Sequence, residues 1–300
     1  MDIELKKFNS FRIESKSNFF QKIKTEKELL SLIKKAKKEK LKIIPLGAGS
    51  NVLFKKRVKS ALLKISNKEI KIKNNKIIVS AGLSLANLLN KCLKNNLSGL
   101  EWAIGIPGTV GGAIFGNAGA FSQSISNFVE EVESIDIETG RKIIRKNKEC
   151  YFDYRQSIFQ KKKEIIWRAV LKLKKEKKKK IERKMKEFLE KRKKSQPIGS
   201  WSAGSIFKNV PLDRFPKKIQ KELKKIFPQK KLIPTGYLIE KTGLKGKTIG
   251  GAQISKKHAN FIINTGKAET EDIEKLINLI KKEVSKKFKV KLEKEIRIIS

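Results

Sequence analysis

Three short polar segments hold side chains that could carry out chemistry. Cys150–Ser157 places one arginine among aromatic and hydroxyl groups, and Ser202–Asn209 is a small-residue turn with two serines, a lysine and an amide. The closing segment Leu292–Ile299 is predicted to be a strand that carries two acids, Glu293 and Glu295. Residues two apart on a strand point to the same face, so their spacing alone does not choose between these acids. Together the three segments supply groups that can bind anions and exchange protons.

A glycine-rich run, Trp102–Phe121, could hold a cofactor. Its twenty residues carry no charge in a chain of which 34% is charged. The length would allow a membrane span, but glycine and proline would interrupt a helix there, so we expect no span. Backbone amides in successive turns form a concave site for phosphate oxygens. The run is therefore interpreted as a cofactor cradle, with a packed glycine-rich turn as the alternative, and bulk at Gly47 or Gly111 should block the cofactor without unfolding the chain.

A second glycine-rich turn, Gly47–Asn51, follows a predicted strand and precedes the apolar segment Val52–Phe54. It reads G-x-G-x-x-V, and no helix is predicted after it, which disfavours the parallel-sheet dinucleotide fold. The chain has no G-x-x-x-x-G-K-[ST] loop. Ser50 and Asn51 could still donate hydrogen bonds to a phosphate.

The remaining pattern predicts an α+β chain of two domains. Thr25 and Glu28 form a capping-box pattern before one helix, and Ser84 caps a second. Strands are expected at 42–46, 52–54, 61–65, 70–72, 76–79, 132–137, 142–145, 165–173, 261–264 and 292–299, and a last helix over 273–284. The lysine-rich segment Leu171–Lys194 keeps apolar residues at helical spacing, so it is predicted to be a solvated helix carrying the domain boundary. The predicted domains are 1–178 and 179–300.

The formal net charge of +42 suggests nucleic acid or an anionic membrane as a partner. Only ten of the 72 basic residues are arginine, however, and aromatic residues do not alternate with the lysine runs. Bidentate phosphate or base recognition relies on arginine, and a stacking platform needs aromatic residues. We therefore expect no specific nucleic-acid partner, only weak salt-dependent adhesion to polyanions. A lysine-rich nucleic-acid-binding protein without catalysis stays open as an alternative function.

The two cysteines indicate neither a disulfide framework nor a metal site. Cys92 lies in helical register with leucines, which predicts core packing, and neither Cys92 nor Cys150 has metal-ligand spacing around it. Met1 is followed by Asp2 and Glu4 and not by a basic, then apolar, leader. We expect a cytoplasmic protein that binds no metal and has no obligate protein partner.

Seven blocks, in this order and at compatible spacing, resemble the UDP-N-acetylenolpyruvoylglucosamine reductase (UDP-N-acetylmuramate dehydrogenase) family: PLGAGSNVL, GIPGTVGGAIFGNAGAF, YFDYRQSIF, SAGSIFKN, LIEKTGLKG, GGAQISKKHANFIIN and LEKEIRII. The resemblance covers nearly the whole chain. It implies an FAD-binding domain of the vanillyl-alcohol-oxidase type, followed by a smaller α+β substrate-binding domain. The short interval from Tyr154 to Ser205 resembles the shorter form of the family, which lacks an insert with a substrate tyrosine.

The same resemblance implies a reaction and its residues. UDP-N-acetylglucosamine enolpyruvate would be reduced to UDP-N-acetylmuramate, with non-covalent FAD as cofactor and NADPH as hydride donor. Arg155 would steady the enolate, Ser205 would deliver a proton and Glu295 would be the acidic partner. The expected chemistry agrees with the residue types, because an arginine and a protonated acid can stabilise negative charge and a hydroxyl can supply a proton.

The resemblance also implies binding positions. The positions similar to substrate contacts are Tyr154, Asn209 and His258. FAD would be held by Gly47, Ala48, Gly49, Ser50, Asn51, Gly105, Ile106, Pro107, Gly108, Thr109, Gly111, Gly112 and Ala113.

The chain departs from the family pattern in three places. FRIESKSNFF lacks the usual Gly-Gly pair after Arg-Ile, which puts a flavin contact near Glu14 and Ser15 in doubt. Val210 follows FKN in place of proline, and Lys294 stands where proline is common. A flavin oxidase of the same fold acting on another alcohol or sugar is a further alternative, but it leaves the SAGS and EIR blocks unexplained.

Overall fold

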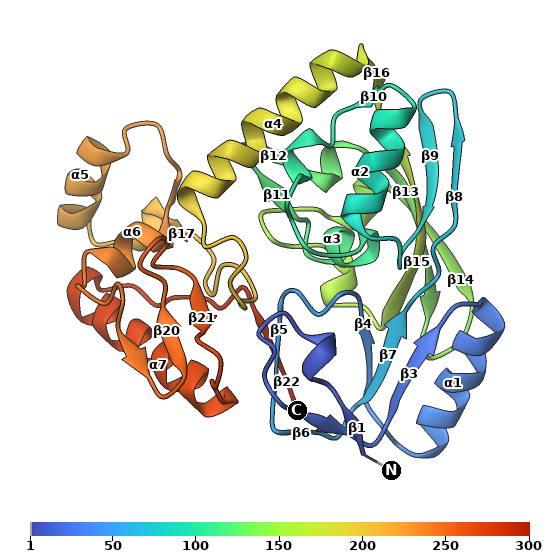
Figure 1. The fold of residues 1–300 in the computed structure, drawn as a ribbon, viewed down its shortest axis with the longest axis horizontal. Coiled ribbons are helices and arrows are strands. Elements are labelled where there is room, and N and C mark those ends of the chain that lie inside the picture. Colours follow the sequence, from blue (N-terminus) through green and yellow to red (C-terminus); the bar gives the residue numbers. More distant parts are fainter. Residues whose placement is uncertain (1) are drawn as a thin grey trace. The chain divides into compact units, whose positions relative to one another are not determined.

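The computed structural model describes residues 2–300 and divides them into two compact units, each with its own hydrophobic core (Figure 1). The first unit contains residues 17–48 and 59–194 together with Asp2 and Ile3, and the second contains 4–16, 49–58 and 195–300. None of the helices within residues 2–300 combines the length and the apolar composition that crossing a membrane requires.

Two sheets form the frame of the first unit. The larger is antiparallel, with strand order β14-β13-β15-β9-β8, and the smaller is parallel, with order β3-β7-β4. Their strands are β3 (Phe20–Ile23), β4 (Ile43–Leu46), β7 (Ala61–Ile65), β8 (Ile70–Lys73), β9 (Lys76–Ser80), β13 (Val129–Asp136), β14 (Lys142–Lys146) and β15 (Glu164–Lys172). The predicted strands of this region are confirmed to within a few residues.

The first two helices begin where the sequence predicts. Thr25 and Glu28 make both hydrogen bonds of a capping box before α1 (Glu26–Lys38). The Ser84 hydroxyl accepts from the amide of Asn87 at the start of α2 (Leu85–Lys94). Cys92, on α2, is buried in the first core as expected.

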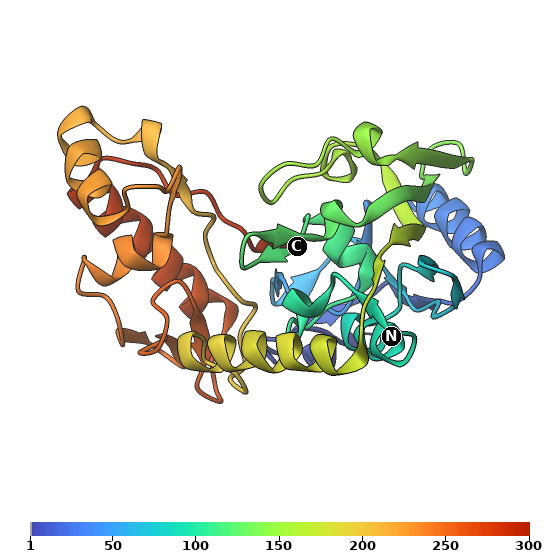
Figure 2. The ribbon, with the colours of Figure 1, turned by 90° about the horizontal axis from the view of Figure 1, so that it is seen from above.

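The lysine-rich helix α4 (Lys178–Ser195) runs without interruption (Figure 2). Ile181 is buried in the first core, and Met185 and Phe188 pack against that core. These apolar contacts keep α4 with the first unit, so the contact boundary falls at 194/195 and not at the predicted 178/179.

The glycine-rich run folds into several short elements of the first unit. It contains a 3₁₀ turn (Glu101–Ala103), helix α3 (Val110–Phe115) and strand β11 (Gly119–Ala120), which pairs with β12 (Gln123–Ser124). Trp102, Val110 and Ile114 are fully buried. Helix α3 contacts β9 and β15, so the run is packed against the large sheet.

Short strands and three helices form the second unit. Its strands are β5 (Val52–Phe54), β17 (Val210–Pro211), β18 (Leu232–Ile233), β19 (Thr248–Ile249), β20 (Ala252–Ile254), β21 (Ile262–Asn264) and β22 (Arg297–Ile299), and its helices are α5 (Lys217–Ile226), α6 (Thr235–Glu240) and α7 (Thr270–Phe288). Helix α7 buries one apolar face in the second core. The predicted strand 292–299 is regular only in β22, which pairs in parallel with β5.

The remaining elements are small. They are β1 (Ile3–Glu4), β2 (Lys16–Ser17), β6 (Arg57–Val58), β10 (Leu97–Ser98), β16 (Lys174–Lys175) and the 3₁₀ turns Lys6–Phe8, Ile125–Asn127, Asn147–Cys150, Ile158–Gln160 and Leu212–Arg214. Strands β1, β2 and β6 form one sheet, and β10 pairs with β16.

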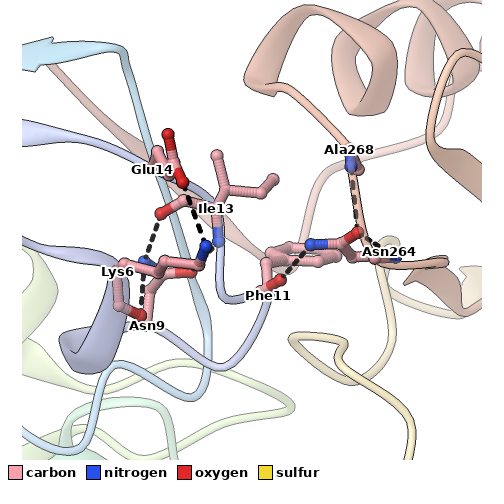
Figure 3. Close-up of polar contacts among 8 residues, drawn as sticks. Lys6, Asn9, Phe11, Ile13, Glu14, Asn264 and Ala268 are labelled. Carbon is pink, nitrogen blue, oxygen red and sulfur yellow. Dashed lines mark hydrogen bonds and ion pairs between the residues drawn. The ribbon is translucent and has the colours of Figure 1, made fainter.

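The N-terminal segment 4–16 belongs to the second unit, although the predicted boundary placed it in the first domain (Figure 3). The Asn9 side chain donates to the carbonyl of Ile13 at 3.1 Å and accepts from its amide at 3.2 Å, which closes the segment on itself. The Asn264 side-chain amide donates to the carbonyl of Phe11 at 2.7 Å, while its oxygen accepts from the amide of Ala268 at 3.0 Å. Phe11 and Ile13 are buried in the second core, which explains the assignment.

Candidate functional site

The second unit holds Ser205 and Glu295 on neighbouring backbone segments. The amide of Glu295 donates to the carbonyl of Ile206 at 2.8 Å, and Phe207 and Lys294 form an antiparallel bridge. On its other side Ser205 is bridged to Phe261. Two predicted catalytic residues that lie ninety positions apart in the chain are thus brought together by backbone pairing.

The acid that the sequence left open, Glu293, is engaged in an ion pair. Its carboxylate lies 2.5 Å from the ammonium of Lys208. The side chain of Lys208 is only 14% exposed, so this contact is partly shielded from water. The ion pair gives Glu293 a structural role in this region.

The Asn51 side chain contributes to this region and not only to a phosphate turn. The side-chain nitrogen of Asn51 donates to the carbonyl of Glu295 at 3.1 Å, and the backbone carbonyl of Asn51 accepts from the amide of Arg297 at 3.1 Å. Asn51 therefore helps to hold the segment that carries Glu295.

Asn209 and His258, the predicted substrate contacts of the second unit, are both held by backbone amides. The Asn209 side-chain oxygen accepts from the amide of Thr235 at 3.2 Å. His258 Nδ1 accepts from the amide of Asn260 at 3.2 Å, and burial lowers the pKa of His258. A backbone amide can only donate, so this imidazole is neutral and carries its proton on Nε2.

Arg155 and Tyr154 lie in the first unit, next to the glycine-rich run. Arg155 Nη2 donates to the carbonyl of Gly119 at 2.9 Å, and the guanidinium lies over the ring of Tyr154 at 5.4 Å. Arg155 has a positive φ of 55°, within a tight turn where Asp153 and Gln156 pair. Non-glycine residues in this conformation are uncommon and occur often at functional sites.

Gly47, at the start of the second turn, lies close to Thr109 of the glycine-rich run within the first unit. The Thr109 hydroxyl caps α3 by accepting from the amide of Gly112 at 3.3 Å. A Cβ added to Gly47 would lie 2.6 Å from that hydroxyl oxygen. Glycine at position 47 is therefore required by the close approach of Thr109.

The turn after Gly47 offers a donor set suited to phosphate. The backbone amides of residues 48–51 donate no hydrogen bond to any acceptor within residues 2–300. Gly49 has a positive φ of 71°, and a Cβ there would lie 1.9 Å from the carbonyl oxygen of Phe8. Turn amides that lack an internal acceptor match the chemistry of an anionic cofactor group such as a pyrophosphate.

The glycines of α3 have different roles. The amide of Gly111 donates to the carbonyl of Ala81 at 2.8 Å. A Cβ added to Gly111 would lie 2.8 Å from the Cβ of Ala81. A side chain at Gly111 would therefore disturb core packing, which argues against the expectation that bulk there leaves the fold intact. Gly112 is exposed, and a Cβ there would meet only the Thr109 hydroxyl at 3.5 Å.

Sequence reasoning missed two cations that contact these turns. Arg192, on α4, donates to the carbonyls of Ile104 at 3.0 Å and Trp102 at 3.1 Å, and it is buried. Lys64, on β7, donates to the carbonyl of Gly47 at 2.6 Å. Arg192 is one of only two arginines in a lysine-rich helix, which is a weak signal, and Lys64 gives no signal in so lysine-rich a chain.

No metal site or reactive thiol stands out in the part of the chain that the structure describes. No group of three His, Cys, Asp or Glu residues within 2–300 could hold a metal ion. Burial raises the pKa of Cys92 to about 12 and that of Cys150 to about 11, so both thiols stay protonated near neutral pH.

Comparisons with known proteins identify the family of the chain. The FAD binding domain family matches residues 19–144, and the family described as UDP-N-acetylenolpyruvoylglucosamine reductase, C-terminal domain, matches 196–299. The chain is 38% identical over 297 residues to UDP-N-acetylenolpyruvoylglucosamine reductase from Caldanaerobacter subterraneus, covering 98% of the chain and 91% of that protein. It is 42% identical over 255 residues to the enzyme of that name from Thermotoga sp. strain RQ2, covering 84% and 78%.

One solved structure is similar over the full length. The crystal structure of UDP-N-acetylenolpyruvylglucosamine reductase from Thermus caldophilus has a TM-score of 0.80 at 29% identity, covering 100% of this chain and 98% of that one. The predicted α+β fold, an FAD-binding domain followed by a smaller C-terminal domain, is confirmed.

Proposed function

The chain belongs to the UDP-N-acetylenolpyruvoylglucosamine reductase family and is a flavin-dependent oxidoreductase, and we propose that it reduces UDP-N-acetylglucosamine enolpyruvate to UDP-N-acetylmuramate with NADPH as hydride donor. We place the reaction in the cytoplasm, in the synthesis of peptidoglycan precursors for the cell wall. The observation that carries the proposal is the backbone pairing that brings Ser205 beside Glu295 in the C-terminal domain of an FAD-binding chain.

The reaction dictates which groups are needed. Adding hydride to the terminal carbon of an enol ether conjugated to a carboxylate leaves negative charge on the neighbouring carbon and the carboxylate. FAD supplies the hydride when bound, because no side chain can do so. The protein must then stabilise the negative charge and protonate the carbon that bears it.

We assign these two tasks to three residues. Arg155 supplies a guanidinium with several N–H donors, and a well-placed donor stabilises developing charge by about 3–4 kcal/mol. The Ser205 hydroxyl donates the proton, which is worth roughly 10² to 10⁴ in rate. Glu295 is the acidic partner that stabilises the same charge. Tyr154, Asn209 and His258 are proposed to bind the substrate.

We assign the cofactor to the two glycine-rich turns of the FAD-binding domain. The amides of 48–51 would bind the pyrophosphate, since they donate to no other group within residues 2–300. The run from Gly105 to Ala113 would supply the second set of contacts, where exposed Gly112 leaves room for a ligand to approach.

Purification followed by an assay tests the proposal. The protein should be yellow, and NADPH oxidation should depend on UDP-N-acetylglucosamine enolpyruvate and give a product two mass units heavier than that substrate. A colourless protein that carries nucleic acid would instead favour the lysine-rich binding function. Oxygen-dependent oxidation of an alcohol or sugar, without reduction of the enolpyruvyl compound, would favour a flavin oxidase.

A further inference from the structure

Lys64 contacts the first residue of the proposed pyrophosphate turn. It lies on β7, next to β4, and its ammonium donates to the carbonyl of Gly47 at 2.6 Å. The side chain is partly buried, and two other lysines act on it: Lys22, its partner in register on β3, and Lys68, which is exposed. This charge-assisted hydrogen bond fixes Lys64 at the start of the turn.

The geometry of the peptide bond links Lys64 to the next amide. No cis peptide occurs within residues 2–300, so the carbonyl of Gly47 and the N–H of Ala48 point in opposite directions in one plane. A hydrogen bond that fixes the carbonyl therefore fixes the direction of the Ala48 N–H. That N–H donates to no acceptor within residues 2–300. Polarisation of the peptide by the ammonium also makes the N–H a stronger donor.

We propose that Lys64 is a positioning residue for the cofactor: its ammonium holds the carbonyl of Gly47 and thereby directs the amide of Ala48 at an anionic pyrophosphate oxygen. The inference rests on the proposed binding of pyrophosphate by residues 48–51. Lys64 acts through the peptide, from the side opposite the ligand, and does not itself touch the phosphate. The thermal stability of the apoprotein should therefore depend on it less than the affinity for FAD does.

Titration of the FAD-stripped full chain with FAD tests this role. Lys64→Met should weaken FAD binding about tenfold, the value of one charge-assisted hydrogen bond. Lys64→Arg should restore affinity to within about threefold of wild type, and Lys71→Met, a control at an exposed lysine of β8, should leave it unchanged. Melting of each apoprotein in parallel separates cofactor binding from folding.

The affinity for FAD measured over a pH series separates the positioning role from a purely structural one, because a purely structural lysine would not change its pH dependence. Burial lowers the pKa of Lys64, and Lys22 and Lys68 lower it further. The protonated form holds the carbonyl, so the affinity of the wild type for FAD should fall as the pH rises through that pKa. Lys64→Arg stays protonated and should show a flat profile over the same alkaline range.

Two results would overturn the inference, and one more variant identifies the cause. Lys64→Met binding FAD within twofold of wild type, or Lys64→Arg keeping the alkaline loss, would exclude the positioning role. Ala48→Asp places a negative charge in the turn and should abolish FAD binding. If it does so while Lys64→Met binds normally, only the role of Lys64 fails; if Ala48→Asp binds FAD normally, the turn does not hold the pyrophosphate and both proposals fail.

Discussion

The ammonium of Lys208 and the carboxylate of Glu293 lie 2.5 Å apart. Lys208 belongs to the segment that follows Ser205, and its backbone amide donates to the carbonyl of Glu293 at 2.9 Å. The side chain and the backbone of Glu293 therefore both help to hold the segment of Lys208 and the segment of Glu293 in register. Glu295 stays the proposed acid of the reaction because the family resemblance points to it.

Neutralising the two acids should therefore have different effects. Glu295→Gln keeps the shape and hydrogen-bonding groups of the side chain but removes the acid, so kcat should fall by about two orders of magnitude. Glu293→Gln should keep kcat within about threefold and cost at most about 1 kcal/mol of unfolding free energy, because Glu293 is 58% exposed. Steady-state kinetics and denaturant unfolding of both variants check this. Equal losses of kcat would contradict the distinction.

Bulk at the exposed glycine of α3 should remove the cofactor without unfolding the chain. In Gly112→Val the new side chain has open space around it but projects where a ligand would approach. The purified variant should be colourless, with a near-native far-ultraviolet spectrum. Gly111→Val is the comparison, since it overlaps Ala81 and should lower the melting temperature as well. Stoichiometric FAD in Gly112→Val would exclude this helix from the cofactor site.

Local chemistry in the sequence predicted the elements well. The helices capped by Thr25 and by Ser84 begin where expected. A helix cap forms within about four consecutive residues, so its pattern can be read from the sequence. The short apolar runs at 61–65 and 76–79 likewise predicted β7 and β9, because strand and hairpin signals are also local.

Long-range contacts explain what the sequence did not predict. The N-terminal segment joins the second unit through Phe11 and Asn264, which are separated by 253 positions. Gly105 was expected to serve the cofactor, yet a Cβ there would lie 3.2 Å from Arg192 Cδ, so packing against α4 also requires glycine. Neither contact leaves a local pattern. The family resemblance nominated Ser205 and Glu295, whereas their backbone pairing is visible only in three dimensions.

Arg192 should stabilise the first unit more than other arginines of α4 do. Arg192→Met keeps much of the apolar volume but leaves the carbonyls of Trp102 and Ile104 without these donors, which should cost about 1–3 kcal/mol of unfolding free energy. Arg183→Met is the control, because Arg183 is 72% exposed and pairs with Glu187 at 3.6 Å; it should change stability by about 0.5 kcal/mol or less. Denaturant unfolding of the apoproteins compares them, and equal stabilities would refute the assignment.

His258 should make the protein less stable in mild acid. Burial lowers its pKa in the folded state from the ordinary value of 6.5, so between the two values the unfolded chain binds the extra proton. This contribution to stability is complete above pH 6.5, declines as the pH falls, and is fully lost below the folded pKa. The slope from one proton is at most about 1.4 kcal/mol per pH unit. His258→Asn retains an acceptor for the amide of Asn260 but does not titrate, so its stability should fall less between pH 7 and pH 5; identical pH profiles would contradict this.

The proton-donor role of Ser205 predicts a loss confined to one half of the reaction. Ser205→Ala should leave reduction of the flavin by NADPH nearly unchanged, because no proton from Ser205 is needed there. Reoxidation by UDP-N-acetylglucosamine enolpyruvate should slow by roughly 10² to 10⁴, since the carbon that bears the negative charge has lost its donor. Ser205→Cys restores a dissociable proton at nearly the same place and should recover part of that rate. Rapid-mixing measurements of flavin absorbance follow the two half-reactions separately. If Ser205→Ala slowed reduction by NADPH and spared reoxidation, Ser205 would not be the proton donor, and its place beside Glu295 would need another explanation.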